Sequence, residues 1–187
     1  MNPHHSLAPR RLALSLLAAA ALAGALGGCI PLVVGGAVGT AMVASDRRTS
    51  GAQLEDEGIE LRSVNRIRDN MGDSAHINVT SYNRLVLLTG EVASAQAKQQ
   101  LSDLIAKVDN ARSVVNETAV DVPSSLGQRS ADTLTTGRVK AALVDTRNIQ
   151  SRAFKVVTER GVVYLMGIVT QREADLAAEV ARNVSSV

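Results

Sequence analysis

The sequence INVTSYNRLVLLTGEV (residues 77–92) aligns without a gap with FKVVTERGVVYLMGIV (residues 154–169), 77 positions further along the chain. In the first copy, Ile77 and Val79 and then Leu85 and Leu87 alternate with other residues, which is the pattern of a strand with one buried face. Residues 83–84 and 160–161 occupy the position of a turn. Each copy is therefore predicted to form a β-hairpin, and the chain is built from a repeat.

Helical segments are expected on both sides of each hairpin. Stretches rich in Ala with Gln or Glu follow the hairpins at residues 94–108 and 171–184, and further helices precede them at residues 55–71 and 132–145. In the first copy, residues 113–120 have the composition of a last strand. The predicted class is α+β, with two tandem αββαβ modules, each a small mixed sheet that carries two helices on one face.

The predicted domain limits follow from this repeat. The first module covers residues 54–121, a linker covers residues 122–129, and the second module covers residues 130–187. The second copy reaches only Val187, which aligns near Ala111 of the first copy, as expected of a fragment or of an early stop. We therefore expect this copy to lack its last strand, and to have the smaller sheet with an unprotected edge.

Composition excludes several classes of function. The chain has 187 residues, of which 45% are hydrophobic and 20% charged, and this is too apolar for intrinsic disorder. With one Phe, two Tyr and no Trp, it offers little surface for stacking on bases, so no nucleic-acid partner is expected. A single cysteine, Cys29, allows no disulfide within one chain and no thiolate metal site.

The first 28 residues have the organisation of a secretory signal peptide. Arg10 and Arg11 form the positive end, residues 12–26 are an apolar run, and the run ends at Leu26-Gly27-Gly28-Cys29. This ending resembles the lipobox of bacterial lipoproteins. The resemblance implies that Cys29 carries diacylglycerol and an N-acyl chain such as palmitate, and that residues 29–53 are an apolar, glycine-containing tether. No other cofactor is expected.

Two further features concern the membrane. Ile30 stands where an aspartate would favour retention in the inner membrane, so the lipobox resemblance implies export to the outer membrane. The alternative is an uncleaved transmembrane anchor, because no charged residue occurs from Leu12 to Ser45.

Charge is distributed unevenly once the signal peptide is removed. Residues 54–121 contain 7 basic and 11 acidic side chains, a net charge of −4, whereas residues 129–187 contain 9 basic and 6 acidic side chains, a net charge of +3. Modules of opposite charge favour different partners.

No catalytic or metal-binding motif is evident, so an enzyme is not expected. If the leader carrying His4 and His5 is removed, His76 is the one remaining imidazole, and a lone histidine before a strand is more typical of a surface or turn position. The acidic groups at residues 55–57 and at Glu173 and Asp175 are assigned to helix starts, where they would stabilise the helix dipole.

The hairpins carry the most specific motifs. These are residues 77–80 with Tyr82, 86–88 with Gly90, 156–159 with Gly161, 165–167 with 169–170, and 172–174. The unit they define resembles the BON domain, and its doubled form behind a lipobox resembles the dual-BON outer-membrane lipoproteins of the DolP/YraP family. That resemblance implies a protein anchored in the inner leaflet of the outer membrane and facing the periplasm. It further implies support of membrane integrity and a role at division sites.

One helix of the second module is a candidate membrane-binding element. At 100° per residue, Val139 and Leu143 face the sheet, whereas Leu134 and Arg138 lie about 130° away. Exposed apolar and basic side chains together suit binding to an anionic lipid surface. The family resemblance implies the same role, with Leu134 where an aromatic residue is often found. The predicted phospholipid-binding residues are Leu134, Arg138, Lys140 and Ala141.

Two functions follow as hypotheses. The first is binding of anionic phospholipid through the second module in support of envelope integrity. The second is a protein-interaction adaptor for outer-membrane assembly or division machinery, in which lipid contact is incidental and the acidic first module binds the partner. The alternative to a membrane-binding helix at residues 132–145 is an ordinary solvent-exposed amphipathic helix that carries one exposed leucine.

Overall fold

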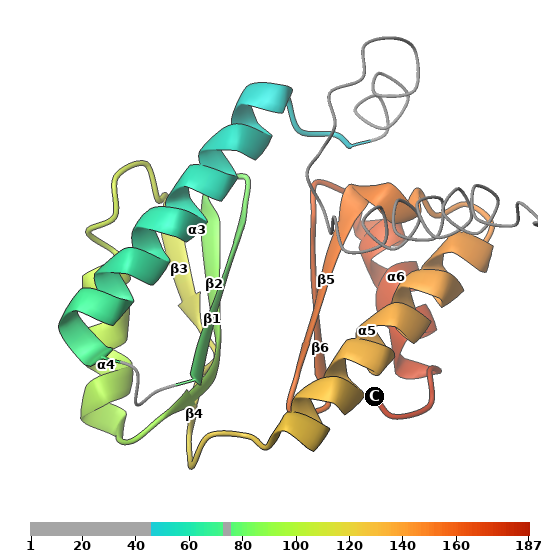
Figure 1. Ribbon diagram of the computed structural model, residues 1–187. Helices are drawn as coiled ribbons and strands as arrows, with labels where there is room; N and C mark the ends of the chain where they lie inside the picture. Colours follow the sequence, from blue (N-terminus) through green and yellow to red (C-terminus); the bar gives the residue numbers. More distant parts are fainter. Residues whose placement is uncertain (1–45, 73–75) are drawn as a thin grey trace, which may run out of the picture. The chain divides into compact units, whose positions relative to one another are not determined.

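The computed structural model describes residues 46–72 and 76–187, which belong to one unit of the chain (Figure 1). The first module begins with helix α3 (Ser50–Met71), followed by the hairpin strands β1 (His76–Tyr82) and β2 (Leu85–Val92). Helix α4 (Ala95–Ile105) and the short strands β3 (Ser113–Asn116) and β4 (Ala119–Val120) complete it.

Strand β2 is the centre of the first sheet. It pairs antiparallel with β1 on one side and parallel with both β3 and β4 on the other. The strand predicted at residues 113–120 is thus present but interrupted at Glu117 and Thr118, where the Asn116 side chain accepts a hydrogen bond from the Thr118 N–H (3.1 Å). Helices α3 and α4 pack on one face of this sheet, as predicted; the buried core residues are Ile59, Ile67, Val86, Leu88, Val92, Leu101, Ile105 and Val108.

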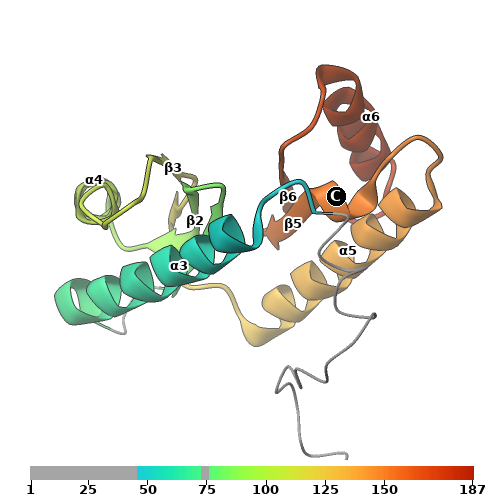
Figure 2. The ribbon, with the colours of Figure 1, turned by 90° about the horizontal axis from the view of Figure 1, so that it is seen from above.

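The second module contains helix α5 (Leu126–Asp145), a 3₁₀ turn η2 (Ser151–Ala153), strands β5 (Phe154–Glu159) and β6 (Val162–Gly167), and helix α6 (Gln171–Arg182). Its sheet has two strands, and within the described residues no strand pairs with the outer edge of β6. Both helices lie on the same side of β5 and β6 (Figure 2). Their shared core is Val139, Leu143, Val156, Ala177 and Ala181.

Both first helices begin earlier than the apolar periodicity predicts. Helix α3 begins at Ser50 because the Thr49 hydroxyl accepts a hydrogen bond from the Ala52 N–H (3.1 Å), so the last residues of the expected tether are helical. Helix α5 begins at Leu126 because Ser125 and Gln128 form a capping box. The second half of the predicted linker, residues 126–129, therefore forms the first turn of α5.

The two hairpins have the same register. Ile77 pairs with Gly90 in the first module, and Phe154 pairs with Gly167 in the second, each 77 positions further along. A Cβ atom at Gly90 would lie 2.0 Å from the His76 carbonyl oxygen, and one at Gly167 would lie 2.8 Å from that of Ala153. The predicted equivalence of Gly90 and Gly167 is confirmed, because both lie where the partner strand comes too close for a side chain.

A buried aspartate in each first helix holds the hairpin turn of its own module. Asp56 accepts hydrogen bonds from the backbone N–H groups of Asn83 and Arg84, each at 2.7 Å. Asp132 does the same for the N–H groups of Arg160 (2.8 Å) and Gly161 (2.9 Å). All four turn residues have positive φ angles of 51–76°, as in a type I′ turn.

The assignment of residues 55–57 to a helix start is wrong. Because α3 begins at Ser50, these acidic groups lie beyond its first turn. Asp56 also accepts from the Ser81 hydroxyl and pairs with Arg48, both at 2.7 Å. Burial raises the pKa of Asp56, but these donors outweigh it and hold the pKa below its ordinary value. Glu173 does lie in the first turn of α6, as predicted, whereas Asp175 lies beyond it.

Candidate functional site

The predicted lipidation site lies outside the described residues. This applies to Cys29, to the lipobox residues Leu26, Gly27 and Gly28, and to most of the tether. Lipidation of Cys29 and cleavage before it therefore stay predictions. Within residues 46–72 and 76–187, no helix is both long and apolar enough to cross a bilayer.

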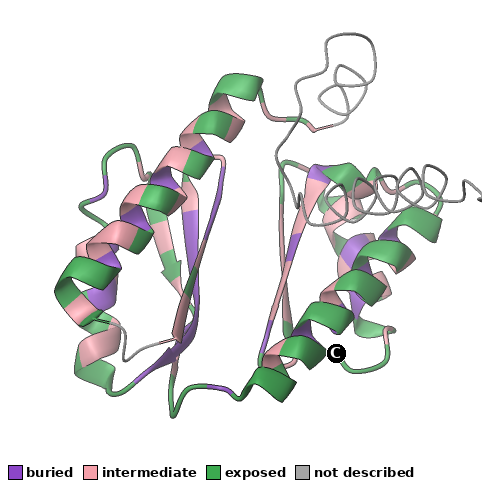
Figure 3. Cartoon of the chain, in the orientation of Figure 1, coloured by how far each residue is buried: buried purple, intermediate pink, exposed green. Residues whose placement is uncertain are grey.

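The outer face of α5 brings Leu134, Arg138 and Ala141 within about 60° of one another, whereas Lys140 lies on the flank of the helix, about 120° from Leu134. Leu134, Arg138, Lys140 and Ala141 are all exposed, and the side chain of Leu134 is 62% exposed. Exposed residues run along the length of this helix in Figure 3. Val139 and Leu143 on the opposite face are buried, as the periodicity predicts. The placement of Leu134 off the core is thus confirmed, whereas its contact with lipid stays a prediction.

Two apolar residues of the same face were not predicted. Leu126 and Val144 are 79% and 67% exposed, and at 100° per residue they lie on one line along α5, about 80° from Leu134. Leu126 was missed because it was itself assigned to the linker at residues 122–129. The capping pattern Ser125-x-x-Gln128 is the signal that would have placed it in the helix.

Neither of the two predicted cations of α5 is held by an ion pair in the part of the chain that the structure describes. Lys140 makes no ion pair within the described residues. Arg138 donates a hydrogen bond to the Ser186 hydroxyl (3.1 Å) and likewise forms no ion pair there. The acidic groups nearest in sequence are Asp132, which is occupied by the hairpin turn, and Asp145 at the helix end. The middle of the helix therefore presents positive charge beside Leu134.

A second helix also exposes apolar side chains. Leu54 and Leu61 of α3 are 68% and 63% exposed and lie seven residues apart, on one face of that helix. Val64 on the same helix is also exposed. This surface belongs to the acidic first module, so apolar exposure alone does not distinguish α5. What distinguishes α5 is the charge of its module, which is +3 over residues 129–187, against −4 over residues 54–121.

Polar contacts join the two modules along β1 and β5. The Tyr82 hydroxyl donates to the Ala153 carbonyl oxygen (3.0 Å), and the Lys155 ammonium pairs with Glu60 (2.6 Å). Arg160 pairs with Asp121 (2.7 Å) and with Glu91 (3.3 Å), and Glu91 is completely buried. Burial raises the pKa of Glu91, but hydrogen bonds from His76, Ser124 and Arg160 hold it below its ordinary value.

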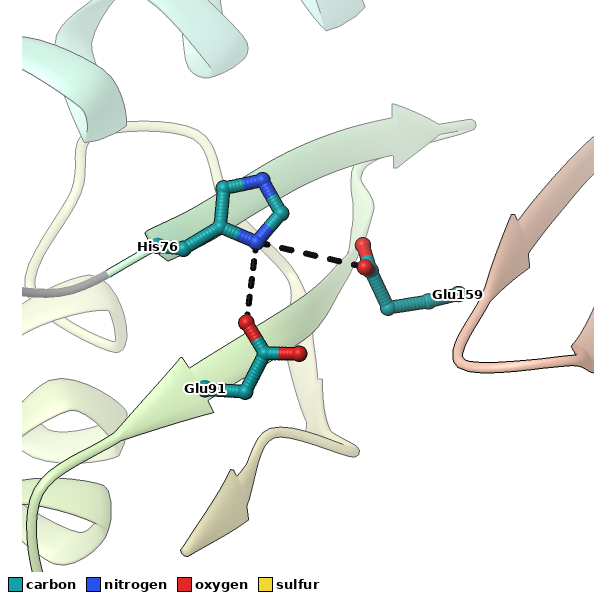
Figure 4. Close-up of side chains that lie close together, drawn as sticks. All are labelled: His76, Glu91 and Glu159. Carbon is teal, nitrogen blue, oxygen red and sulfur yellow. Dashed lines mark hydrogen bonds and ion pairs between the residues drawn. The ribbon is translucent and has the colours of Figure 1, made fainter. Parts of the chain in front are cut away.

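His76 lies in this contact region and not on a free surface. Its Nδ1 atom lies 3.0 Å from Glu91 Oε2 and 4.0 Å from Glu159 Oε1 (Figure 4). Sequence reasoning missed this group because Glu91 and Glu159 belong to different modules. Only the packing of β1 and β2 beside the end of β5 brings the three side chains together.

Comparison with known proteins agrees with this architecture. The family model of the BON domain matches residues 56–121 and 131–187, which correspond to the two modules. The outer membrane lipoprotein DolP of Haemophilus influenzae is 35% identical over 164 residues, covering 87% of this chain and 85% of that protein. The 21 kDa hemolysin of Actinobacillus pleuropneumoniae is 35% identical over 144 residues, covering 76% of this chain and 74% of that protein. The chain belongs to the BON-domain family, among the dual-BON lipoproteins related to DolP.

Proposed function

We propose that this protein is a non-enzymatic lipoprotein of the outer membrane, anchored through Cys29 in the inner leaflet and facing the periplasm. In this proposal the second module binds anionic phospholipid through the outer face of α5 and so supports envelope integrity. The relationship to DolP, which is named an outer membrane lipoprotein, supports the location.

The observation that carries the lipid-binding proposal is the exposure of Leu134 on the same face of a basic module as Arg138, which forms no ion pair within the described residues, with Lys140 on the flank of the helix. An apolar side chain that enters the acyl boundary gains free energy in proportion to the area it buries. Arg138 and Lys140 add attraction to anionic headgroups, about 1 kcal/mol for each cation near the surface. The net charge of +3 over residues 129–187 acts in the same direction.

The second candidate function is a protein-interaction adaptor, and the exposed face of α3 favours it. Leu54 and Leu61 offer an apolar surface on the acidic module, where attraction to an anionic membrane is absent. A partner in outer-membrane assembly or division would then bind α3, and contact between α5 and lipid would be incidental.

Vesicle co-sedimentation of the unlipidated region separates the two functions. Vesicles containing phosphatidylglycerol should carry the protein into the pellet, and purely zwitterionic vesicles should carry much less. Raising the salt from 0.1 M to 1 M shortens the screening length from about 10 Å to about 3 Å and should weaken this binding without abolishing it, because the apolar contribution remains. Equal binding to both vesicles, or binding to neither, would contradict the lipid proposal and favour the adaptor.

A further inference from the structure

His76, Glu91 and Glu159 point one donor atom each toward a common centre. These three atoms all lie within 4.8 Å of one another, and Figure 4 shows the side chains converging from three strands. His76 and Glu91 are directly paired residues of β1 and β2, so the backbone ladder fixes their spacing. Glu159 is the last residue of β5 and completes the group from the second module.

Other donors hold each carboxylate so that one oxygen faces the imidazole. Oε2 of Glu159 accepts hydrogen bonds from the Asn78 amide (2.6 Å) and the Thr89 hydroxyl (3.4 Å), which leaves Oε1 directed toward His76. In Glu91, Oε1 accepts from Arg160 (3.3 Å), and Oε2 faces His76 with only a long contact from the Ser124 hydroxyl (3.4 Å). Partners of this kind orient the first ligands of metal sites.

Two buried carboxylates lie at this centre. Arg160, which pairs with Glu91, also pairs with Asp121. Burying two carboxylates close together is costly, and a bound dication would offset that cost.

We infer that His76, Glu91 and Glu159 form a binding site for a divalent transition metal of the zinc class. Zinc accepts mixed imidazole and carboxylate ligands, often three from the protein with a fourth position for water. Tetrahedral bonds of about 2.0–2.1 Å place neighbouring donors roughly 3.3 Å apart. The present separations from Nδ1, 3.0 Å and 4.0 Å, lie on either side of that value. Calcium and magnesium do not suit the site, since they take six or more oxygen ligands or nearly intact hydration shells.

The position of the metal site between the modules determines how an ion reaches it and what a bound ion does. A cavity of about 390 Å³ is lined by two of the three ligands, His76 and Glu159, and gives an ion and its water a route to them. Two ligands belong to the first module and one to the second. A bound ion therefore adds a direct link between the modules, replacing the contact of His76 with Glu91.

The test uses the full lipidated protein, purified in mild detergent without a histidine tag. Competition with a chromophoric chelator measures zinc affinity, and visible absorption of the cobalt-loaded protein reports the ligand set. The wild type should bind one zinc ion per chain, with a higher melting temperature when zinc is present. His76→Ala and Glu159→Gln should each weaken the affinity by at least about 100-fold and remove the cobalt bands. Calcium and magnesium should not compete.

Glu60→Gln is the matched control, because it removes another carboxylate that joins the modules, through Lys155 at 2.6 Å, without touching the three ligands. It should bind zinc as the wild type does. The site is refuted if the wild type binds no zinc, if His76→Ala and Glu159→Gln bind it unchanged, or if Glu60→Gln weakens it as much as Glu159→Gln does. Circular dichroism checks folding, and if His76→Ala unfolds the protein, Glu159→Gln decides the question.

Discussion

Replacing Leu134 with glutamate tests the membrane-binding face of α5 at its most apolar point. The side chain is 62% exposed, so its insertion can bury about that fraction of its surface. Full burial of a leucine is worth roughly 1.5–3 kcal/mol, which leaves about 1–2 kcal/mol for this position. A carboxylate near an anionic surface adds about 1 kcal/mol of repulsion. Leu134→Glu should therefore weaken binding by about 2–3 kcal/mol, or about 30- to 140-fold.

Leu61→Glu provides the matched control, since it introduces the same substitution at a leucine of α3 that is 63% exposed. Its binding to phosphatidylglycerol vesicles should equal that of the wild type. Both variants should keep the wild-type free energy of unfolding to within about 0.5 kcal/mol, because both positions lie off the core. Leu134→Trp should bind more tightly, since tryptophan prefers the membrane interface.

Three results would refute this reasoning. Unchanged vesicle binding by Leu134→Glu would remove α5 from the membrane contact. An equal loss in Leu61→Glu would show that any exposed carboxylate has the same effect. A large loss of stability in Leu134→Glu would show that the side chain supports the core. If instead Leu61→Glu impairs envelope function while both variants bind lipid normally, the adaptor function is favoured.

Four other predictions concern the fold and the anchor. Asp56→Asn should cost about 3–5 kcal/mol of unfolding free energy because it breaks a buried ion pair, and Asp132→Asn only about 1–3 kcal/mol; equal costs in urea denaturation would contradict this. Gly90→Ala should lower the free energy of unfolding by more than about 3 kcal/mol, because the new Cβ atom would collide with a carbonyl oxygen. Gly161→Ala should lower it by only about 1 kcal/mol of backbone strain, because the space around Gly161 is open. Hydrogen bonds from Arg47 and Thr170 lower the pKa of Glu173 to about 2. The stability that Glu173 contributes is therefore fully present above pH 4.5, the ordinary pKa of a glutamate, and is lost as the pH falls toward 2. Glu173→Gln should flatten the dependence of the urea midpoint on pH between these two values. Cys29→Ala should abolish palmitate labelling and leave the precursor uncleaved, and normal labelling would exclude the lipidation site.

Features that depend on local periodicity could be predicted from the sequence. The two hairpins, their shared register and the exposure of Leu134 follow from side-chain patterns within a few residues. The starts of α3 and α5 were placed too late, because capping by Thr49 and Ser125 occurs before the apolar pattern begins. Helix limits set by single hydrogen bonds are not visible in hydrophobic periodicity.

Features that join distant parts of the chain could not be predicted. The hydrogen bonds that the N–H groups of the hairpin turn donate to Asp56 span 27 and 28 residues. The contact between His76 and Glu159 joins two modules. An isolated acidic residue carries no sign of which distant donors it will meet, so Asp56 was interpreted as a contribution to the helix dipole. The repeat did contain a usable signal, since Asp56 and Asp132 stand at nearly equivalent positions before the two turns.

The burial of β2 on both faces limits how these modules can be rearranged in evolution. Val86 and Leu88 face the helices of their own module, whereas Leu87, Thr89 and Glu91 are buried on the other side, where Glu159 and Arg160 supply polar partners. Without the second module, that second face of the strand would lose these partners. Gene fusion that transferred the first module alone would therefore have to supply new partners for this face, so the pair is expected to be inherited together.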